Sequence, residues 1–168
     1  MGKKLGVIGL GAIGALVANA AVELGMEVYG ADPFLSVNGA LNLSNRVHYV
    51  KTREELFEMC DYITLHAPAT PETKKMINAE TIAKMKDGVR IINLSRSELV
   101  NSTHMIKAVA DKKVAAYVTD FATPDIIGVD NIIVIPHLGA STNESEDNCA
   151  VMAAKQLVDY LENGNIVN

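Results

Sequence analysis

An arginine stands shortly after the apolar residues Ile91, Ile92 and Leu94 in the segment IINLSRSELVN. A charged side chain seldom stays fully buried without a partner, so Arg96 either reaches solvent or meets an anionic group. The guanidinium is a planar fork of hydrogen-bond donors that matches the two oxygens of a carboxylate. Arg96 is therefore a candidate clamp for an acidic substrate.

A histidine stands in the turn IPHLGAST, between an apolar run and a long helical pattern. An imidazole can take or give a proton near neutral pH, so His137 is a candidate acid and base. Asp120 and Asp125 follow another apolar run and could orient the ring. The alternative is that His137 only marks the entry to the helix. His66 also ends an apolar run, where its backbone is expected to line a ligand pocket.

The segment GLGAIG, residues 9–14, follows an apolar run and opens a helical pattern. Gly9 permits a tight turn, Gly11 allows the backbone to approach a pyrophosphate, and Gly14 allows close packing of helix on strand. Asp32 follows the next apolar run, where its carboxylate could accept hydrogen bonds from a ribose and repel a 2′-phosphate. The charge of this carboxylate therefore favours NAD over NADP. The alternative is that the glycines only form turns, but that role would not require an acid at this position.

Strand and helix patterns alternate from end to end, apart from a loop expected over residues 33–45. The alternation predicts an α/β fold: a doubly wound, mostly parallel sheet of the Rossmann type, in three layers with helices on both faces. Ligands of such sheets bind beyond the carboxyl ends of the strands, where all the candidate residues lie. The first expected strand begins at residue 7, and the others cover residues 26–32, 47–50, 61–68, 89–94, 114–120 and 131–136. The expected helices cover residues 13–24, 53–59, 78–86 and 102–113, and a last helix runs from Ser141 or Thr142 to Gly164.

Two helices are expected to bury apolar stripes, because their apolar residues recur at helical spacing. The first stripe comprises Ile13, Leu16, Val17, Ala20, Ala21 and Leu24, and the stripe of the last helix comprises Cys149, Ala153, Leu157, Tyr160 and Leu161.

The 168 residues predict a single domain, and the net charge of −5 without a basic run disfavours nucleic acid or an anionic membrane as a partner. Cys60 and Cys149 belong to no metal-ligand spacing or disulfide framework, so no metal is expected. Without an apolar run long enough to span a membrane, the chain is expected in the cytoplasm with two reduced thiols.

The motifs together resemble the D-isomer-specific 2-hydroxyacid dehydrogenases. The likeness covers essentially the whole chain and includes GLGAIG with Asp32, HAPATPET, NLSRSELVN, VTDF and above all PHLGAST. It implies that Arg96 holds the substrate carboxylate and that His137 is the acid and base. It also implies cofactor contacts around the glycine turn and the nicotinamide ring, at Ala12, Ile13, Asp32, Ala67, Pro68, Leu94, Ser95, Asp120 and the run from His137 through Gly139 to Ala140.

Two departures from the family pattern affect these assignments. The third catalytic residue of the family is a glutamate, whose position falls on Asp125, or on Pro124 if the register slips by one residue. The arginine segment carries Ser95, Ser97 and Glu98 in place of small residues, which suggests a subgroup.

The resemblance also carries expectations for the whole protein. Residues 1–168 correspond to the NAD-binding domain alone, so the substrate-binding domain of the family is expected to be absent and the isolated chain inactive. The implied reaction is hydride transfer between NAD and a small 2-hydroxy or 2-oxo acid, with D-3-phosphoglycerate, at the first step of L-serine biosynthesis, as the expected substrate. Alternative substrates are glyoxylate, hydroxypyruvate and D-lactate, and a non-catalytic NAD-binding or dimerisation module is a further alternative. A homodimer through this domain is expected.

Overall fold

The computed structural model describes residues 2–166 and divides into two compact units, Met1–Ile135 and Pro136–Asn168. The first unit contains the sheet with helices α1 to α5, and the second contains helix α6.

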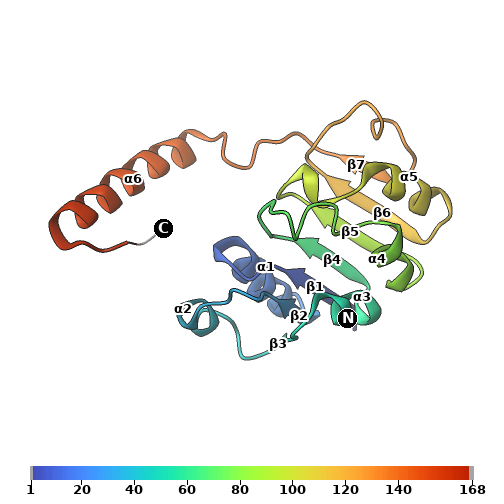
Figure 1. Ribbon diagram of the computed structural model, residues 1–168, viewed down its shortest axis with the longest axis horizontal. Coiled ribbons are helices and arrows are strands. Elements are labelled where there is room, and N and C mark those ends of the chain that lie inside the picture. Colours follow the sequence, from blue (N-terminus) through green and yellow to red (C-terminus); the bar gives the residue numbers. More distant parts are fainter. Residues whose placement is uncertain (1, 167–168) are drawn as a thin grey trace. The chain divides into compact units, whose positions relative to one another are not determined.

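Within residues 2–166, seven parallel strands form one sheet in the order β3-β2-β1-β4-β5-β6-β7 (Figure 1). The strand order changes direction between β1 and β4, which is where sheets of this type bind ligands. The predicted α/β fold of the Rossmann type is confirmed. The strands are β1 Lys4–Ile8, β2 Glu27–Ala31, β3 Val47–Tyr49, β4 Tyr62–Leu65, β5 Val89–Asn93, β6 Val114–Thr119 and β7 Ile132–Val134.

Apolar cores lie on both faces of the sheet, because successive side chains of a strand point to opposite sides. Val7 of β1 packs in the core formed with α1 (Ala12–Glu23). The next residue, Ile8, packs in the core formed with α3 (Arg53–Met59), α4 (Ala79–Lys84) and α5 (Ser102–Ala110). Helices therefore cover both faces, as predicted.

The buried face of α1 differs from the predicted one. The residues that α1 buries are mostly small: Gly14, Ala15, Ala18, Ala21 and Val22. Of the predicted stripe, Ile13 is 69% exposed, Leu16 is 70% exposed and Leu24 is 81% exposed. The start of α1 lies so close to the preceding turn that a Cβ at Gly14 would come within 1.9 Å of the Gly9 carbonyl oxygen. Close approach of helix and sheet selects small side chains at this contact, and the larger ones point outward.

The predicted loop over residues 33–45 contains a short helix, α2 (Val37–Leu41). Ser36 caps it, because its side chain accepts a hydrogen bond from the Gly39 N–H. The side chain of Asn19 on α1 donates to the Asn42 carbonyl at 2.8 Å and accepts from the Ser44 N–H at 2.8 Å. These bonds hold the segment after α2 against α1.

Most predicted helix ends agree with the structure. Asn78 caps α4 by accepting the N–H groups of Glu80 and Thr81. Two helices end earlier than predicted: α4 at Lys84, because the next residue has extended backbone, and α5 at Ala110. Lys112 then adopts a positive φ of 59°, which a helix cannot contain.

The face that carries α1 is less covered on the other half of the sheet. Val7, Thr64, Ile92, Val118 and Ile133 form one row across β1, β4, β5, β6 and β7. Val7 and Thr64 are buried, Ile92 and Val118 are half-buried, and Ile133 is 52% exposed. Apolar exposure therefore increases along the row toward β7.

The second unit contains α6 (Asn143–Asn163), which Thr142 caps by accepting the Ser145 N–H. Gly164 ends the helix with a φ of 73°, as glycine at this position commonly does. Leu157, Tyr160 and Leu161 of the predicted stripe are exposed, and α6 buries none of its residues.

In the described part of the chain, residues 2–166, no helix has both the length and the apolar character needed to cross a membrane.

Candidate functional site

The turn between β1 and α1 is tightly packed at both outer glycines. Gly9 has a φ of 92° and donates its N–H to the Ala31 carbonyl of β2. A Cβ at Gly9 would lie 2.5 Å from the His66 carbonyl oxygen, at the end of β4. Gly14 is equally constrained, because its Cβ would meet the Gly9 carbonyl oxygen at 1.9 Å. The turn is thus enclosed by β2 and β4, and it admits no side chain at either position.

The middle of the same turn is open. A Cβ at Gly11 would meet no atom within 4 Å, and Gly11 precedes the exposed residues Ala12 and Ile13 in the first turn of α1. The N–H groups in the first turn of a helix have no acceptor within the helix, and they lie at the positive end of its dipole. An anionic group such as a pyrophosphate could therefore approach the backbone here.

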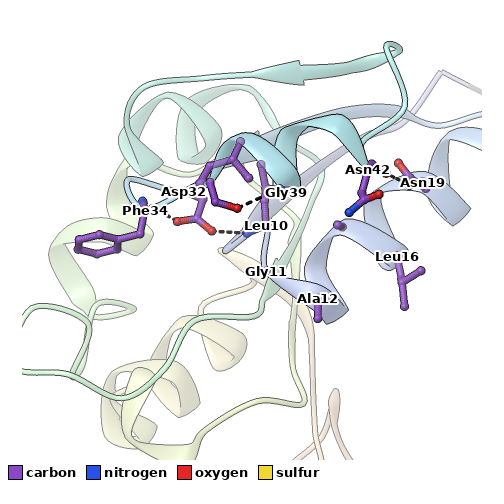
Figure 2. Close-up of a pocket in the computed structure, with 12 residues that line it drawn as sticks. Leu10, Gly11, Ala12, Leu16, Asn19, Asp32, Phe34, Gly39 and Asn42 are labelled. Atoms are coloured by element: carbon purple, nitrogen blue, oxygen red, sulfur yellow. Dashed lines mark hydrogen bonds between the residues drawn. The ribbon is translucent and has the colours of Figure 1, made fainter. Parts of the chain in front are cut away.

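Asp32 follows β2 and lies beside this turn (Figure 2). Its Oδ2 accepts the Leu10 N–H at 2.8 Å and its Oδ1 accepts the Phe34 N–H at 2.8 Å. Each carboxylate oxygen can accept a further bond, so the fixed carboxylate is suited to a diol. Asp32 also lines a cavity of about 550 Å³ between α1 and α2, whose other lining residues include Gly11, Ala12, Asn19, Ser36 and Asn42.

His66 directly follows β4 and lies against the glycine turn. Its N–H donates to the Ile8 carbonyl at 2.7 Å, and its Nε2 lies 3.0 Å from the hydroxyl oxygen of Thr64. Burial lowers the pKa of the imidazole from its ordinary value of 6.5. Ala67, half-buried, and Pro68, exposed, continue along this edge of the sheet.

Replacing His66 by asparagine is expected to weaken the pH dependence of stability. Because the pKa of His66 is lower in the folded chain, the unfolded chain binds the proton first. The stabilisation is present above pH 6.5 and is lost as the pH falls through the lower, folded value. Melting temperatures measured from pH 8 to pH 5 should fall less steeply for His66→Asn than for the unmodified chain. Parallel curves would contradict this assignment.

The segment after β5 carries Leu94, Ser95 and Arg96. Leu94 is 44% exposed, and Arg96 is exposed and donates from its Nη1 to the Ser95 carbonyl at 2.6 Å. Of the two possibilities that the sequence leaves open, the structure places Arg96 at the surface. It lies at the carboxyl edge of the sheet, the same edge as the glycine turn.

Two acids follow β6. Asp120 comes directly after the strand and is 9% exposed. Asp125 lies further along, in an exposed loop, and the nearby Thr123 and Ser102 hydroxyls lower the pKa of its carboxyl group. Asp125 is thus an ionised carboxylate near the start of α5.

His137, Gly139 and Ala140 belong to the second unit, where they precede α6. All three are exposed, and the Leu138 N–H between them donates to the Pro136 carbonyl. The structure therefore gathers Gly9 to Gly14, Asp32, Ala67, Pro68, Leu94 to Arg96 and Asp120 along one edge of the first unit, and it places the histidine segment in the second unit. In residues 2–166 no group of three or more His, Cys, Asp or Glu side chains is arranged to hold a metal ion.

Sequence reasoning did not single out Asn93, the last residue of β5. Its side chain is fully buried and bonds to the segment that carries Arg96. A polar residue closing an apolar run was the available signal, because a buried amide requires hydrogen-bond partners.

Comparison with known proteins gives one family. Residues 1–139 match the family model described as "D-isomer specific 2-hydroxyacid dehydrogenase, NAD binding domain". The D-3-phosphoglycerate dehydrogenase of Synechocystis sp. is 40% identical over 165 residues, which cover 95% of this chain and 29% of the relative. This chain therefore spans less than a third of that relative's length.

Two solved structures are also similar. A glyoxylate reductase from Paecilomyes thermophila superposes with a TM-score of 0.84 at 26% identity, covering 99% of this chain and 51% of the other. A D-lactate dehydrogenase with NAD+ from Lactobacillus jensenii has a TM-score of 0.81 at 25% identity, covering 99% of this chain and 54% of the other. The chain therefore belongs to the D-isomer specific 2-hydroxyacid dehydrogenase family, of which it carries the NAD-binding domain.

Proposed function

We propose that this chain is the cofactor domain of an enzyme that oxidises D-3-phosphoglycerate at C2, the first step of L-serine biosynthesis. In this proposal the chain binds NAD at the turn between β1 and α1. The observation that carries the proposal is the fixed Asp32 carboxylate beside a glycine turn that is open at Gly11, on the edge that also carries Arg96. The names of the Synechocystis relative and of other relatives support the substrate. Glyoxylate, hydroxypyruvate and D-lactate are the competing substrates.

The residues of this edge fit a dinucleotide. A pyrophosphate fits the open space at Gly11, where the first N–H groups of α1 can donate to it. The Asp32 carboxylate would accept bonds from the hydroxyls of the adenosine ribose, and its charge disfavours a 2′-phosphate there. The other residues proposed to contact the cofactor are Gly9, Ala12, Ile13, Gly14, Ala67, Pro68, Leu94, Ser95, Asp120, Gly139 and Ala140.

The proposed reaction assigns three catalytic residues. When bound, NAD accepts the hydride that leaves C2 of the hydroxy acid. Arg96 binds the substrate carboxylate through its fork of donors, which fixes the orientation of C2. His137 takes the proton from the C2 hydroxyl as the carbon–oxygen double bond forms. Asp125, whose pKa is lowered by the nearby Thr123 and Ser102 hydroxyls, is the carboxylate proposed to orient the imidazole.

The arrangement of the whole protein is part of the proposal. Residues 1–168 act as the cofactor domain, and the small-molecule acid is enclosed with the help of a separate substrate-binding domain. The chain alone should then behave as an NAD-binding module without turnover. A cytoplasmic homodimer through this domain is proposed.

Replacing Asp32 by alanine tests the cofactor assignment. The change removes the acceptor for the ribose hydroxyls, and losing a bond to a charged group typically costs about 2 kcal/mol, roughly a 30-fold increase in Kd. Calorimetric titration of the chain should therefore show weaker binding of NADH for Asp32→Ala and a smaller preference for NADH over NADPH. An unmodified chain that binds neither dinucleotide would refute the proposed function.

Asp61 provides a matched control. Its Oδ2 accepts the Lys4 N–H at 2.8 Å, the same type and length of bond that Asp32 makes to Leu10. Asp61 precedes β4, so it lies at the amino edge of the sheet, away from the proposed site. Asp61→Ala should reduce the melting temperature and leave the Kd for NADH unchanged.

A further inference from the structure

We propose that Asn93 is a positioning residue for Arg96. Its buried carboxamide fixes the backbone of the turn after β5, and this turn determines where the Arg96 guanidinium lies at the edge of the sheet. This inference deepens the proposed function and depends on it for the role of Arg96 as a carboxylate clamp. Asn93 opens the segment NLSRSELVN, which carries part of the family likeness, but it is not among the expected site residues.

The carboxamide of Asn93 bonds to both residues that follow Leu94. Its Nδ2 donates to the Arg96 carbonyl at 2.9 Å. Its Oδ1 accepts the Ser95 N–H at 3.3 Å and the Ser95 hydroxyl at 3.2 Å. The side chain of Asn93 thus bonds to both Ser95 and Arg96 and stabilises the turn that contains them.

A second contact fixes the carboxamide from the neighbouring strand. Asn93 Nδ2 lies 3.5 Å from the hydroxyl oxygen of Tyr117 on β6, a residue that is 4% exposed. Burial raises the pKa of the Tyr117 phenol, so the hydroxyl keeps its proton. Asn93 itself is 0% exposed. A buried amide without partners is costly, so this set of bonds favours a single orientation of the side chain.

The Arg96 carbonyl is also held from the opposite side. It accepts the Leu99 N–H at 3.3 Å, within the short helix η1 (Ser97–Leu99) that follows. Leu99 is 0% exposed and packs in the core. The backbone of Arg96 therefore has two anchors, one from β5 and one from η1, although its side chain reaches the surface.

This combination is suited to substrate binding. A long, exposed side chain loses conformational freedom when it clamps a ligand, and a fixed backbone reduces that loss. If Asn93 only stabilised the fold, its removal would lower stability without a particular effect on the acid substrate. If it positions Arg96, its removal should raise the KM of the acid far more than the Kd for NADH.

The test compares Asn93→Ala with Asn78→Ala in the complete enzyme. Asn78 is a close match: it donates to the Lys75 carbonyl at 2.9 Å and accepts the N–H groups of Glu80 and Thr81 at 3.0 and 3.2 Å. Both variants should lower the melting temperature. Only Asn93→Ala is expected to raise the KM for the hydroxy acid, by roughly 10- to 100-fold, with a much smaller increase in the Kd for NADH. Tyr117→Phe, which removes only the hydroxyl, should produce a smaller change in the same direction.

A second measurement does not require turnover. Nuclear spin relaxation should show greater motion of the backbone N–H groups of residues 94–96 in Asn93→Ala than in the unmodified chain or Asn78→Ala. If the unmodified enzyme turns over no 2-hydroxy acid, the proposed function fails, and this measurement still decides whether Asn93 fixes the turn. Equal mobility in all three proteins, or equal KM values for the two alanine variants, would overturn the inference.

Discussion

Replacing Gly14 by alanine is expected to distort the cofactor turn and abolish NADH binding. The added Cβ would lie 1.9 Å from the Gly9 carbonyl oxygen and 3.3 Å from the His66 Cβ, so the backbone of the turn or of α1 has to move. Overpacking of this kind costs about 3 kcal/mol, which corresponds to a melting temperature lower by roughly 6 to 12 °C in a domain of this size. Thermal denaturation and calorimetric titration with NADH measure the two effects.

Gly11→Ala is the matched control for this substitution. Its Cβ would meet no atom within 4 Å, and the φ of −66° at Gly11 is one that alanine readily adopts. The melting temperature should therefore stay unchanged, while NADH binds more weakly because the methyl group occupies the space proposed for the pyrophosphate. The interpretation is wrong if Gly14→Ala retains the stability and NADH affinity of the unmodified chain.

Replacing Arg96 by alanine is expected to have the largest effect on catalysis. A bidentate guanidinium makes two bonds to a carboxylate, and removing both costs about 3 to 6 kcal/mol, or roughly 150- to 25,000-fold in kcat/KM. Arg96→Lys should recover only part of this loss, because an ammonium group lacks the planar fork. The measurement is steady-state kinetics of the complete enzyme with a 2-hydroxy acid, together with NADH titration, in which the Kd should not change.

Arg90 provides a control on the same strand. It is also exposed, and its guanidinium lies 5.3 Å from the centre of the Tyr62 ring, near the amino end of β5. Arg90→Ala should leave kcat/KM unchanged, which separates the role of Arg96 from a general loss of positive charge. A similar loss from both substitutions would argue against the clamp.

Much of the fold was predictable because its signals are local in the sequence. The glycine turn, the acid after the second strand and the alternation of strands with helices predicted the parallel sheet. Caps such as Asn78 and Thr142 were also predictable, since a cap is defined by bonds to residues two or three positions away.

The buried face of α1 could not be read in the same way. Periodicity emphasises large apolar residues, and Ile13 and Leu16 recur at helical spacing. The contact with the sheet instead selects small residues such as Gly14 and Ala18, because the helix begins against the turn. Only the distance between helix and sheet in three dimensions shows that α1 buries the face with the small residues and not the predicted stripe.

Short elements and polar contacts were also beyond sequence reasoning. Helix α2 has five residues, too few to show helical periodicity in a segment rich in Ser, Asn and Gly. The partners of Asn93 include a tyrosine 24 positions away. Its bonds depend on how β5 and β6 pair, which the local sequence does not show.

The glycine turn has a consequence for how this domain can be recombined with its relatives. Gly9 bonds to Ala31 of β2, the Leu10 N–H donates to Asp32, and both outer glycines lie against His66, which follows β4. In a chimaeric protein, segments 4–32 and 62–66 should therefore come from the same parent, although 29 residues separate them in the chain. A chimaera that takes the first segment from another family member inherits a turn shaped for that member's fourth strand, so both segments have to be transferred together.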